Sequence, residues 1–137
     1  MMGSKRNKGR GALAELQVAT KVRALGGEVS FPHGDTAGYD LIADFGAPRR
    51  VQVKSALYTK GACYNLMAAH GGQKEILTKT QCDVVCCVVP YGTYVIPIGK
   101  IRDRKLTFFK PGTHRLRFKY PRCKWEDYFE AWHLLEL

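Results

Sequence analysis

Three polar residues have the types and spacing of a chemical site: Asp40, Gln52 and Lys54. Asp40 precedes the apolar run Leu41–Ala43, and the other two alternate with valines in Val51–Lys54. This pattern predicts two antiparallel strands whose valines are buried, while Gln52 and Lys54 share the opposite face. Asp40 then lies near both of them. A carboxylate, an amide and an ammonium group gathered at one sheet edge can bind a cation or an anionic substrate.

The helix expected before this hairpin carries a fourth candidate, Glu15. Residues 11–25 are good helix formers, and Gly26–Gly27 ends the helix. At about 100° per residue, Glu15 falls within an apolar side formed by Ala12, Val18, Ala19 and Val22. An unpaired carboxylate in a dry core costs several kcal/mol, so this carboxylate must have a partner. The partner is either a cation at the helix edge, such as Arg23, or a metal or a water-filled cleft.

Composition places the chain among small, strongly basic globular proteins. Its 137 residues predict one domain, and 22 Lys+Arg against 12 Asp+Glu give a formal charge of +10. Such a charge favours a polyanionic partner, nucleic acid before an anionic membrane, although a basic protein without such a partner is the alternative. No apolar run approaches the ~18 residues of a membrane span, and no signal-peptide core follows the basic N-terminus. We therefore expect no membrane association and a cytoplasmic location, nucleoid-associated when the protein is bound to DNA.

Cysteine usage fits a reducing compartment, because the five cysteines are an odd number without the spacing of a disulfide framework. Three of them, Cys82, Cys86 and Cys87, lie in or beside the apolar run Val84–Val89. We interpret these as small buried hydrophobic residues in preference to zinc ligands.

The chain divides into a basic flexible arm at residues 1–10 and one α/β domain at 11–137, with a central mixed β-sheet flanked by helices. Further strands are predicted at residues 28–31, 63–67, 83–89 and 94–98. The segment Tyr128–Leu135 has helical spacing, and we expect its aromatic side chains to pack on the sheet, with base stacking as the alternative. His33, in a Gly-containing loop, is left outside the site.

The order of these features resembles the PD-(D/E)xK nuclease superfamily, in which an Asp and a later acidic residue-x-Lys lie on adjacent strands beside a helix Glu. It is most similar to the small branch related to archaeal Holliday-junction resolvases and to a cyanobacterial intron-encoded homing endonuclease. The motifs that carry the resemblance are Lys8–Gly9, Glu15, Gly26–Gly27, Gly34–Gly38, Asp40–Ile42 and Gln52–Ser55. The likeness continues through Tyr94–Ile98 and the closing 128–135 segment, so it covers nearly the whole chain.

The resemblance implies a restriction-endonuclease-like fold and a DNA endonuclease that uses Mg²⁺, with Mn²⁺ as an alternative. In such a site Asp40, the side-chain oxygen of Gln52 and the backbone carbonyl of Val53 bind the metal. Glu15 binds it directly or through water. Lys54 orients the attacking water and offsets charge on the scissile phosphate.

Two residues depart from the superfamily pattern. Tyr39 stands at the position of the Pro, which only shapes the approach to the strand. Gln52 replaces the usual acid, and a neutral amide oxygen contributes no charge, so weaker metal affinity is expected. The resemblance marks this Gln as a feature of the homing-endonuclease branch.

Basic and polar residues around the site are candidate DNA contacts: Lys8, Arg10, Ser55, Lys60 and Lys74. Contacts to phosphates position a protein on DNA without reading its sequence. The alternating Arg115, Arg117 and Lys119 form either a second DNA contact or a solvated strand face, and the sequence does not decide between them.

Several functions share these residues. Homing-type cleavage of duplex DNA, resolution of branched DNA and a catalytically inactive DNA-binding module all fit, and nothing in the sequence excludes RNA as a substrate. One site cuts one strand, so cutting two strands requires a symmetric assembly, expected as a homodimer or homotetramer.

Overall fold

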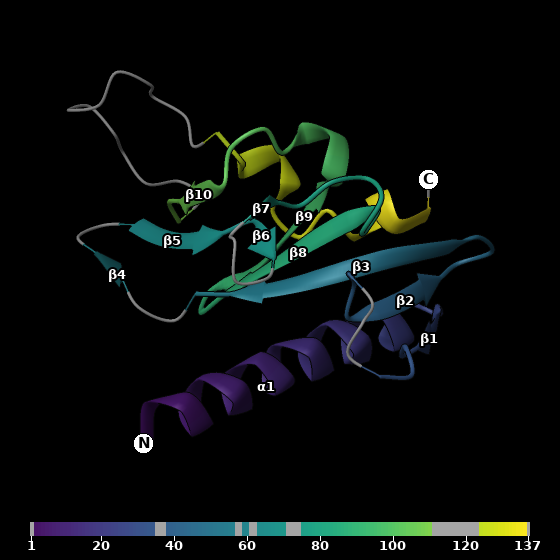
Figure 1. The fold of residues 1–137 in the computed structure, drawn as a ribbon. Helices are drawn as coiled ribbons and strands as arrows, with labels where there is room; N and C mark the ends of the chain where they lie inside the picture. Colours follow the sequence, from purple (N-terminus) through teal and green to yellow (C-terminus); the bar gives the residue numbers. More distant parts are fainter. Residues whose placement is uncertain are drawn as a thin grey trace.

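The computed structural model of the chain (Figure 1) describes residues 2–34, 38–56, 59–60, 63–70, 75–110 and 124–136. Within these ranges, the side chains of residues 2–8, 10, 59–60, 69–70 and 75 lie outside the description. The candidate DNA contacts Lys8, Arg10 and Lys60 are therefore placed by their backbone alone, and Lys74 lies outside the described residues together with the 111–123 segment.

One helix, α1 (Met2–Ala24), runs along a face of the main sheet (Figure 1). Its C-terminal end follows the prediction: the amide of Gly27 donates to the carbonyl of Val22 over 2.9 Å, and that of Gly26 to Arg23 over 3.0 Å. Gly26 has φ 95°, which closes the helix in a Schellman motif. No helix in the described part of the chain is long and apolar enough to cross a membrane.

The helix begins at Met2, well before the predicted start at Gly11. The segment 2–10, predicted as a flexible arm, continues the helix in the structure, and its flexibility stays a prediction. Its glycines suggested a break, but extending a nucleated helix by one residue is cheap, and Lys and Arg are good helix formers.

The main sheet has five strands in the order β1-β2-β3-β8-β9. They are β1 (Glu28–Ser30), β2 (Leu41–Asp44), β3 (Pro48–Ser55), β8 (Val84–Val89) and β9 (Gly92–Pro97). All neighbours are antiparallel except β3 and β8, which run parallel. The predicted mixed α/β domain with a central mixed sheet is confirmed.

A second, smaller sheet of order β10-β5-β4 lies on the side of the main sheet opposite to α1 (Figure 1). It consists of β4 (Thr59–Lys60), β5 (Cys63–Met67) and β10 (Lys105–Phe108), and a short hairpin of β6 (Ala69–His70) and β7 (Glu75–Ile76) adjoins it. In the described residues this face is thus covered mainly by strands and not by an α-helix.

The core therefore has two parts, one on each side of the main sheet. The α1 side buries Ala14, Val18, Ala19 and Val22 against strand residues that include Leu41, Val51 and Val53. Ala12, which was expected on the apolar side of the helix, is exposed, and Ala14 is buried in its place. The other side buries an aromatic and aliphatic cluster that includes Val85, Tyr94, Ile96, Leu106 and Phe108.

The C-terminal segment differs from the predicted helix. It forms two short 3₁₀ helices, η2 (Glu126–Tyr128) and η3 (Trp132–Glu136), after the earlier η1 (Ile98–Lys100). Between them Phe129 forms a bridge to Tyr94 of β9, and Glu130 has φ 53°. Packing of Phe129 on Tyr94, with ring centroids 5.1 Å apart, interrupts a continuous helix. The predicted burial is confirmed for Trp132 and Leu135.

Candidate active site

The β2–β3 hairpin positions Asp40. Leu41 pairs with Val51, the last pair of this ladder, so β3 continues past β2 towards Ser55. Asp40 lies beside that continuing edge: its amide donates to the carbonyl of Val51 over 2.8 Å. Its carboxylate oxygen Oδ2 accepts hydrogen bonds from Gln52 Nε2 over 2.9 Å and from the amide of Val53 over 2.7 Å. The carboxylate is thus held in place by two donors from β3.

The turn before β3 explains why the hairpin has this register. Oδ1 of Asp44 accepts a hydrogen bond from the amide of Gly46 over 2.7 Å, and Gly46 has φ 119°. A side chain that closes such a turn, followed by a glycine in the left-handed region, reverses the chain over few residues. The pairing Asp44↔Pro48 then follows, and with it the pairing that brings Asp40 to Gln52.

Glu15 reaches the same place from α1. Its carboxyl group lies within hydrogen-bonding reach of the Asp40 carboxylate. Partial burial, followed by the negative charge of Asp40 and the hydrogen bond between the two groups, raises the pKa of Glu15 from 4.5 to about 7. The alternative partner, Arg23, instead forms an ion pair with Glu28 over 2.8 Å. Glu15 therefore faces another acid, and Arg23 is paired elsewhere.

Lys54 and Ser55 form the C-terminal end of β3. The burial along this strand alternates as predicted, with Val51 and Val53 buried and Gln52 and Lys54 partly buried. Lys54 is two residues after Gln52, so both side chains leave the same face of the strand. Ser55, at the end of the strand, is partly buried.

The remaining predicted contacts are more distant along the chain. Lys8 lies about two helical turns before Glu15 and Arg10 between them, and Lys60 is in β4. His33, which was left outside the predicted site, is exposed in the loop before Asp40.

The site offers oxygen ligands from two carboxylates, one amide and one backbone carbonyl. In an extended strand the N–H and C=O of one residue point to the same side, so the carbonyl of Val53 faces the edge where Asp40 lies. This donor set suits a hard cation such as Mg²⁺. Nowhere in the described ranges do three His, Cys, Asp or Glu side chains gather into a metal-binding group. A cation here would thus depend on Gln52 and the backbone as well as on the acids.

The described cysteines behave as the sequence predicts. Cys82, Cys86 and Cys87 are buried, and desolvation raises the pKa of the Cys82 thiol to about 11. Burial likewise raises the pKa of Cys86 and Cys87. Thiols that stay protonated in an apolar core are poor metal ligands.

Two residues near Asp40 were given no role from the sequence: Arg50, and Gly38, which was named only as the end of the Gly34–Gly38 motif. The available signals were weak, since Arg50 continues the alternation of Gln52 and Lys54, and Gly38 precedes Asp40 by two positions. Both residues contact the loop of residues 78–81, which is distant from them in the sequence, so no local pattern predicts these contacts.

A family model described as PD-(D/E)XK endonuclease matches residues 5–100. Among solved structures, the chain is similar to a bacterial homing endonuclease, I-Ssp6803I, with a TM-score of 0.78 and 24% sequence identity over 93% of this chain and 91% of that chain. No curated protein matches the sequence. The matched residues include α1 from its fourth residue on, the β2–β3 hairpin and the residues Glu15, Asp40, Gln52, Val53 and Lys54.

Proposed function

The chain belongs to the PD-(D/E)XK endonuclease family, and on this premise we propose that it is a divalent-metal-dependent DNA endonuclease. The observation that carries the proposal is the pairing of Glu15 with Asp40 at the edge of β3, where Gln52 and Val53 also bond to Asp40. Two carboxylates that meet at such a place repel each other when both are ionised, and a cation relieves that repulsion. The formal charge of +10 agrees with a nucleic-acid substrate.

In this proposal Asp40, Glu15, the amide oxygen of Gln52 and the carbonyl of Val53 hold Mg²⁺ or Mn²⁺. When bound, the cation would act as a Lewis acid that offsets negative charge on the phosphate and lowers the pKa of a water molecule. In the structure the amide nitrogen of Gln52 faces Asp40. Ligation through its oxygen requires a half-turn of the amide, which exchanges the two atoms at little steric cost.

Lys54 has a separate role in the proposal. It follows Gln52 and Val53 on β3, and its position on the same strand face as Gln52 supports binding of its ammonium group to a phosphate oxygen beside the carboxylates. There it orients the attacking water and offsets the negative charge that builds on the phosphate. Lys8, Arg10, Ser55, Lys60 and Lys74 are proposed to contact the DNA backbone outside the reacting group.

Within this class we propose homing-type cleavage of duplex DNA by a homodimer or homotetramer. One support is the resemblance of fold to a bacterial homing endonuclease. The other is Gln52, because the resemblance of the sequence motifs implies an amide at this position in that branch. Resolution of four-way junctions is the second candidate, because the same catalytic residues serve both reactions.

A nuclease assay tests the proposal. The purified protein is incubated with four-way junction, nicked and linear duplex DNA of the same arms, with and without Mg²⁺. We expect cleavage of duplex that requires the metal and falls at least 100-fold in Lys54→Ala, while DNA affinity changes only a few-fold. Cleavage of the junction alone would exclude the homing-type function. If the wild-type protein binds DNA without cutting it, and Lys54→Ala and Asp40→Ala bind DNA as it does, the chain is a DNA-binding module without catalytic activity.

A further inference from the structure

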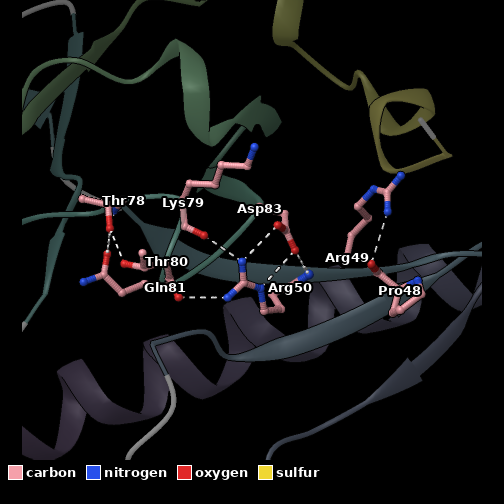
Figure 2. A network of polar contacts seen from close by, with 8 residues as sticks. All are labelled: Pro48, Arg49, Arg50, Thr78, Lys79, Thr80, Gln81 and Asp83. Carbon is pink, nitrogen blue, oxygen red and sulfur yellow. Dashed lines mark hydrogen bonds and ion pairs between the residues drawn. The ribbon is translucent and has the colours of Figure 1, made fainter.

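Arg50 forms an extended polar network beside the candidate site (Figure 2). Its guanidinium donates from Nε to Oδ2 of Asp83 over 3.2 Å and from one terminal nitrogen to Oδ1 over 3.1 Å. It also donates to the backbone carbonyls of Thr80 over 2.9 Å and Lys79 over 2.7 Å. All three guanidinium nitrogens are engaged by protein oxygens, so Arg50 is not disposed as a free cation for phosphate.

The backbone strengthens this connection between β3 and the start of β8. The amide of Arg50 donates to Asp83 Oδ2 over 2.8 Å, and the amide of Asp83 donates to the Arg50 carbonyl over 2.9 Å. Hydrogen bonding by Arg50 lowers the pKa of Asp83, so the carboxylate stays ionised at neutral pH. Two-point arginine–carboxylate pairs of this kind fix geometry as well as adding attraction.

The loop of residues 78–81, which Arg50 contacts, is stabilised by hydrogen bonds between its own first and last residues. Gln81 Oε1 accepts hydrogen bonds from the amide of Thr78 over 2.6 Å and from its hydroxyl over 2.7 Å. The amide of Gln81 donates back to the Thr78 carbonyl over 3.0 Å. Residues 78–81 therefore form a compact turn, which we name the Thr78–Gln81 turn.

This turn supports the chain that leads into Asp40. A Cβ added at Gly38 would lie 2.7 Å from Cβ and 3.1 Å from Cα of Gln81, so the backbone at Gly38 rests directly on the turn. Two residues later, the amide of Asp40 is bonded to Val51, the strand neighbour of Arg50. Arg50 is thus connected to Asp40 by two indirect routes, one through Val51 of β3 and one through the Thr78–Gln81 turn and Gly38.

We propose that Arg50 is a positioning residue for the metal site: it holds the Thr78–Gln81 turn against Gly38 and thereby keeps the Asp40 carboxylate where Gln52 and Val53 bond to it. The assignment of a metal site rests on the proposed function, whereas the control of Asp40 by Arg50 does not. Partners that orient metal-binding side chains from outside are typically worth 10- to 100-fold in metal affinity.

The neighbouring Arg49 supplies a matched control. It stands one residue away, carries the same charge, and its guanidinium donates to the carbonyl of Pro48 over 3.3 Å, away from the Thr78–Gln81 turn (Figure 2). Arg50→Met and Arg49→Met therefore remove the same charge from the same strand, but only the first breaks the network.

A second pair of variants perturbs the same contact from its other side. Gly38→Ala drives a Cβ into Gln81, and Gly27→Ala drives a Cβ to 2.8 Å from Phe45 and Val22 at the end of α1, far from Asp40 in the chain. Neither glycine has a positive φ, so both changes act through the steric contact. This pair keeps the proposal testable if Arg50→Met does not fold.

The first measurement is hydrogen exchange of the Val53 amide in the absence of metal and DNA. This amide donates to Asp40 Oδ2, so its protection reports whether the carboxylate is in place. In Arg50→Met and Gly38→Ala we expect exchange at Val53 to speed up at least 10-fold more than at amides of β9. Arg49→Met and Gly27→Ala should change the two sets of amides in parallel.

The second measurement is the Mg²⁺ concentration for half-maximal cleavage of duplex DNA. We expect it to rise about 10-fold or more in Arg50→Met and Gly38→Ala and less than twofold in their controls. The proposal is overturned if Val53 exchange and the Mg²⁺ requirement of Arg50→Met stay unchanged. This holds whether the variant only melts at a lower temperature or also binds DNA more weakly, as Arg49→Met does. If the wild-type protein shows no metal-dependent cleavage, the proposed function fails, and Val53 exchange still decides the role of Arg50.

Discussion

The raised pKa of Glu15 predicts how metal binding depends on pH. The pKa of Glu15 is raised to about 7, first by burial and then by the charge and hydrogen bond of Asp40. A cation at this site competes with the proton on the Glu15 carboxyl group. Mg²⁺ affinity should therefore rise as pH increases through 7 and level off above it.

The size of the effect follows from the ionised fraction. With a pKa of about 7, the carboxyl is roughly 9% ionised at pH 6 and roughly 91% ionised at pH 8, so the affinity should change about tenfold between them. Glu15→Gln removes the carboxyl group whose pKa lies near 7. The variant should bind Mg²⁺ more weakly at pH 8, with little change between pH 6 and 8.

Calorimetric titration of the protein with Mg²⁺, without DNA, at pH 6, 7 and 8 measures this directly. The control is Glu28→Gln, since Glu28 is 80% exposed, is paired with Arg23, and has no part in the site. We expect the control to keep the wild-type pH dependence. If the Mg²⁺ affinity of the wild-type protein does not change between pH 6 and 8, metal binding is not coupled to the ionisation of Glu15. If the affinity of Glu15→Gln changes with pH as steeply as that of wild type, the titrating group is not Glu15.

Three further predictions concern stability, the metal and the thiols. Because the pKa of Glu15 is raised in the folded state, the stability it contributes is complete below pH 4.5 and is lost as pH rises through about 7. Without metal, Glu15→Gln should therefore unfold at higher denaturant than wild type at pH 8 but not at pH 4, by about 1 kcal/mol after allowance for solvent screening; a difference that grows towards low pH contradicts this. Gln52→Glu adds a third carboxylate beside Asp40, so half-maximal cleavage should need several-fold less Mg²⁺, while the metal-free protein should melt at a lower temperature at pH 8; an unchanged Mg²⁺ requirement would argue against ligation by residue 52. Cys86 and Cys87 are fully buried, and burial raises their pKa. Mass spectrometry after brief alkylation at pH 8 should therefore find both unmodified until denaturant is added, whereas the partly exposed Cys63 should react. Labelling of Cys86 in the folded protein would contradict the core described above.

Much of the hairpin that carries the site could be predicted from the sequence. Alternation in Val51–Lys54 decides which side chains are buried, because successive residues of a strand point to opposite faces. Gly46 indicates a turn and Gly26–Gly27 the end of α1, because glycine adopts positive φ at little cost. Gly46 and Gly26 both have positive φ in the structure. These are local features, in which a few neighbouring residues determine the backbone.

The elements that sequence reasoning missed depend on distant packing. The start of α1 at Met2 extends a helix that its own glycines disfavour, and the C-terminal helix gives way to two 3₁₀ helices where Phe129 packs on Tyr94. The second sheet pairs β5 with β10, whose residues Leu66 and Leu106 lie far apart in the chain. Such pairings depend on which surfaces meet, and that information is not contained in a short window of sequence.

The sequence by itself determined that Glu15 needs a partner and that Asp40, Gln52 and Lys54 gather at one strand edge, because periodicity assigns each side chain to a face. Only the tertiary structure decided that the partner is Asp40 and that Arg23 pairs with Glu28. Only the tertiary structure, too, connects Arg50 through the Thr78–Gln81 turn to Gly38. Faces follow from local geometry, whereas the choice between possible partners follows from which segments of the folded chain meet in space.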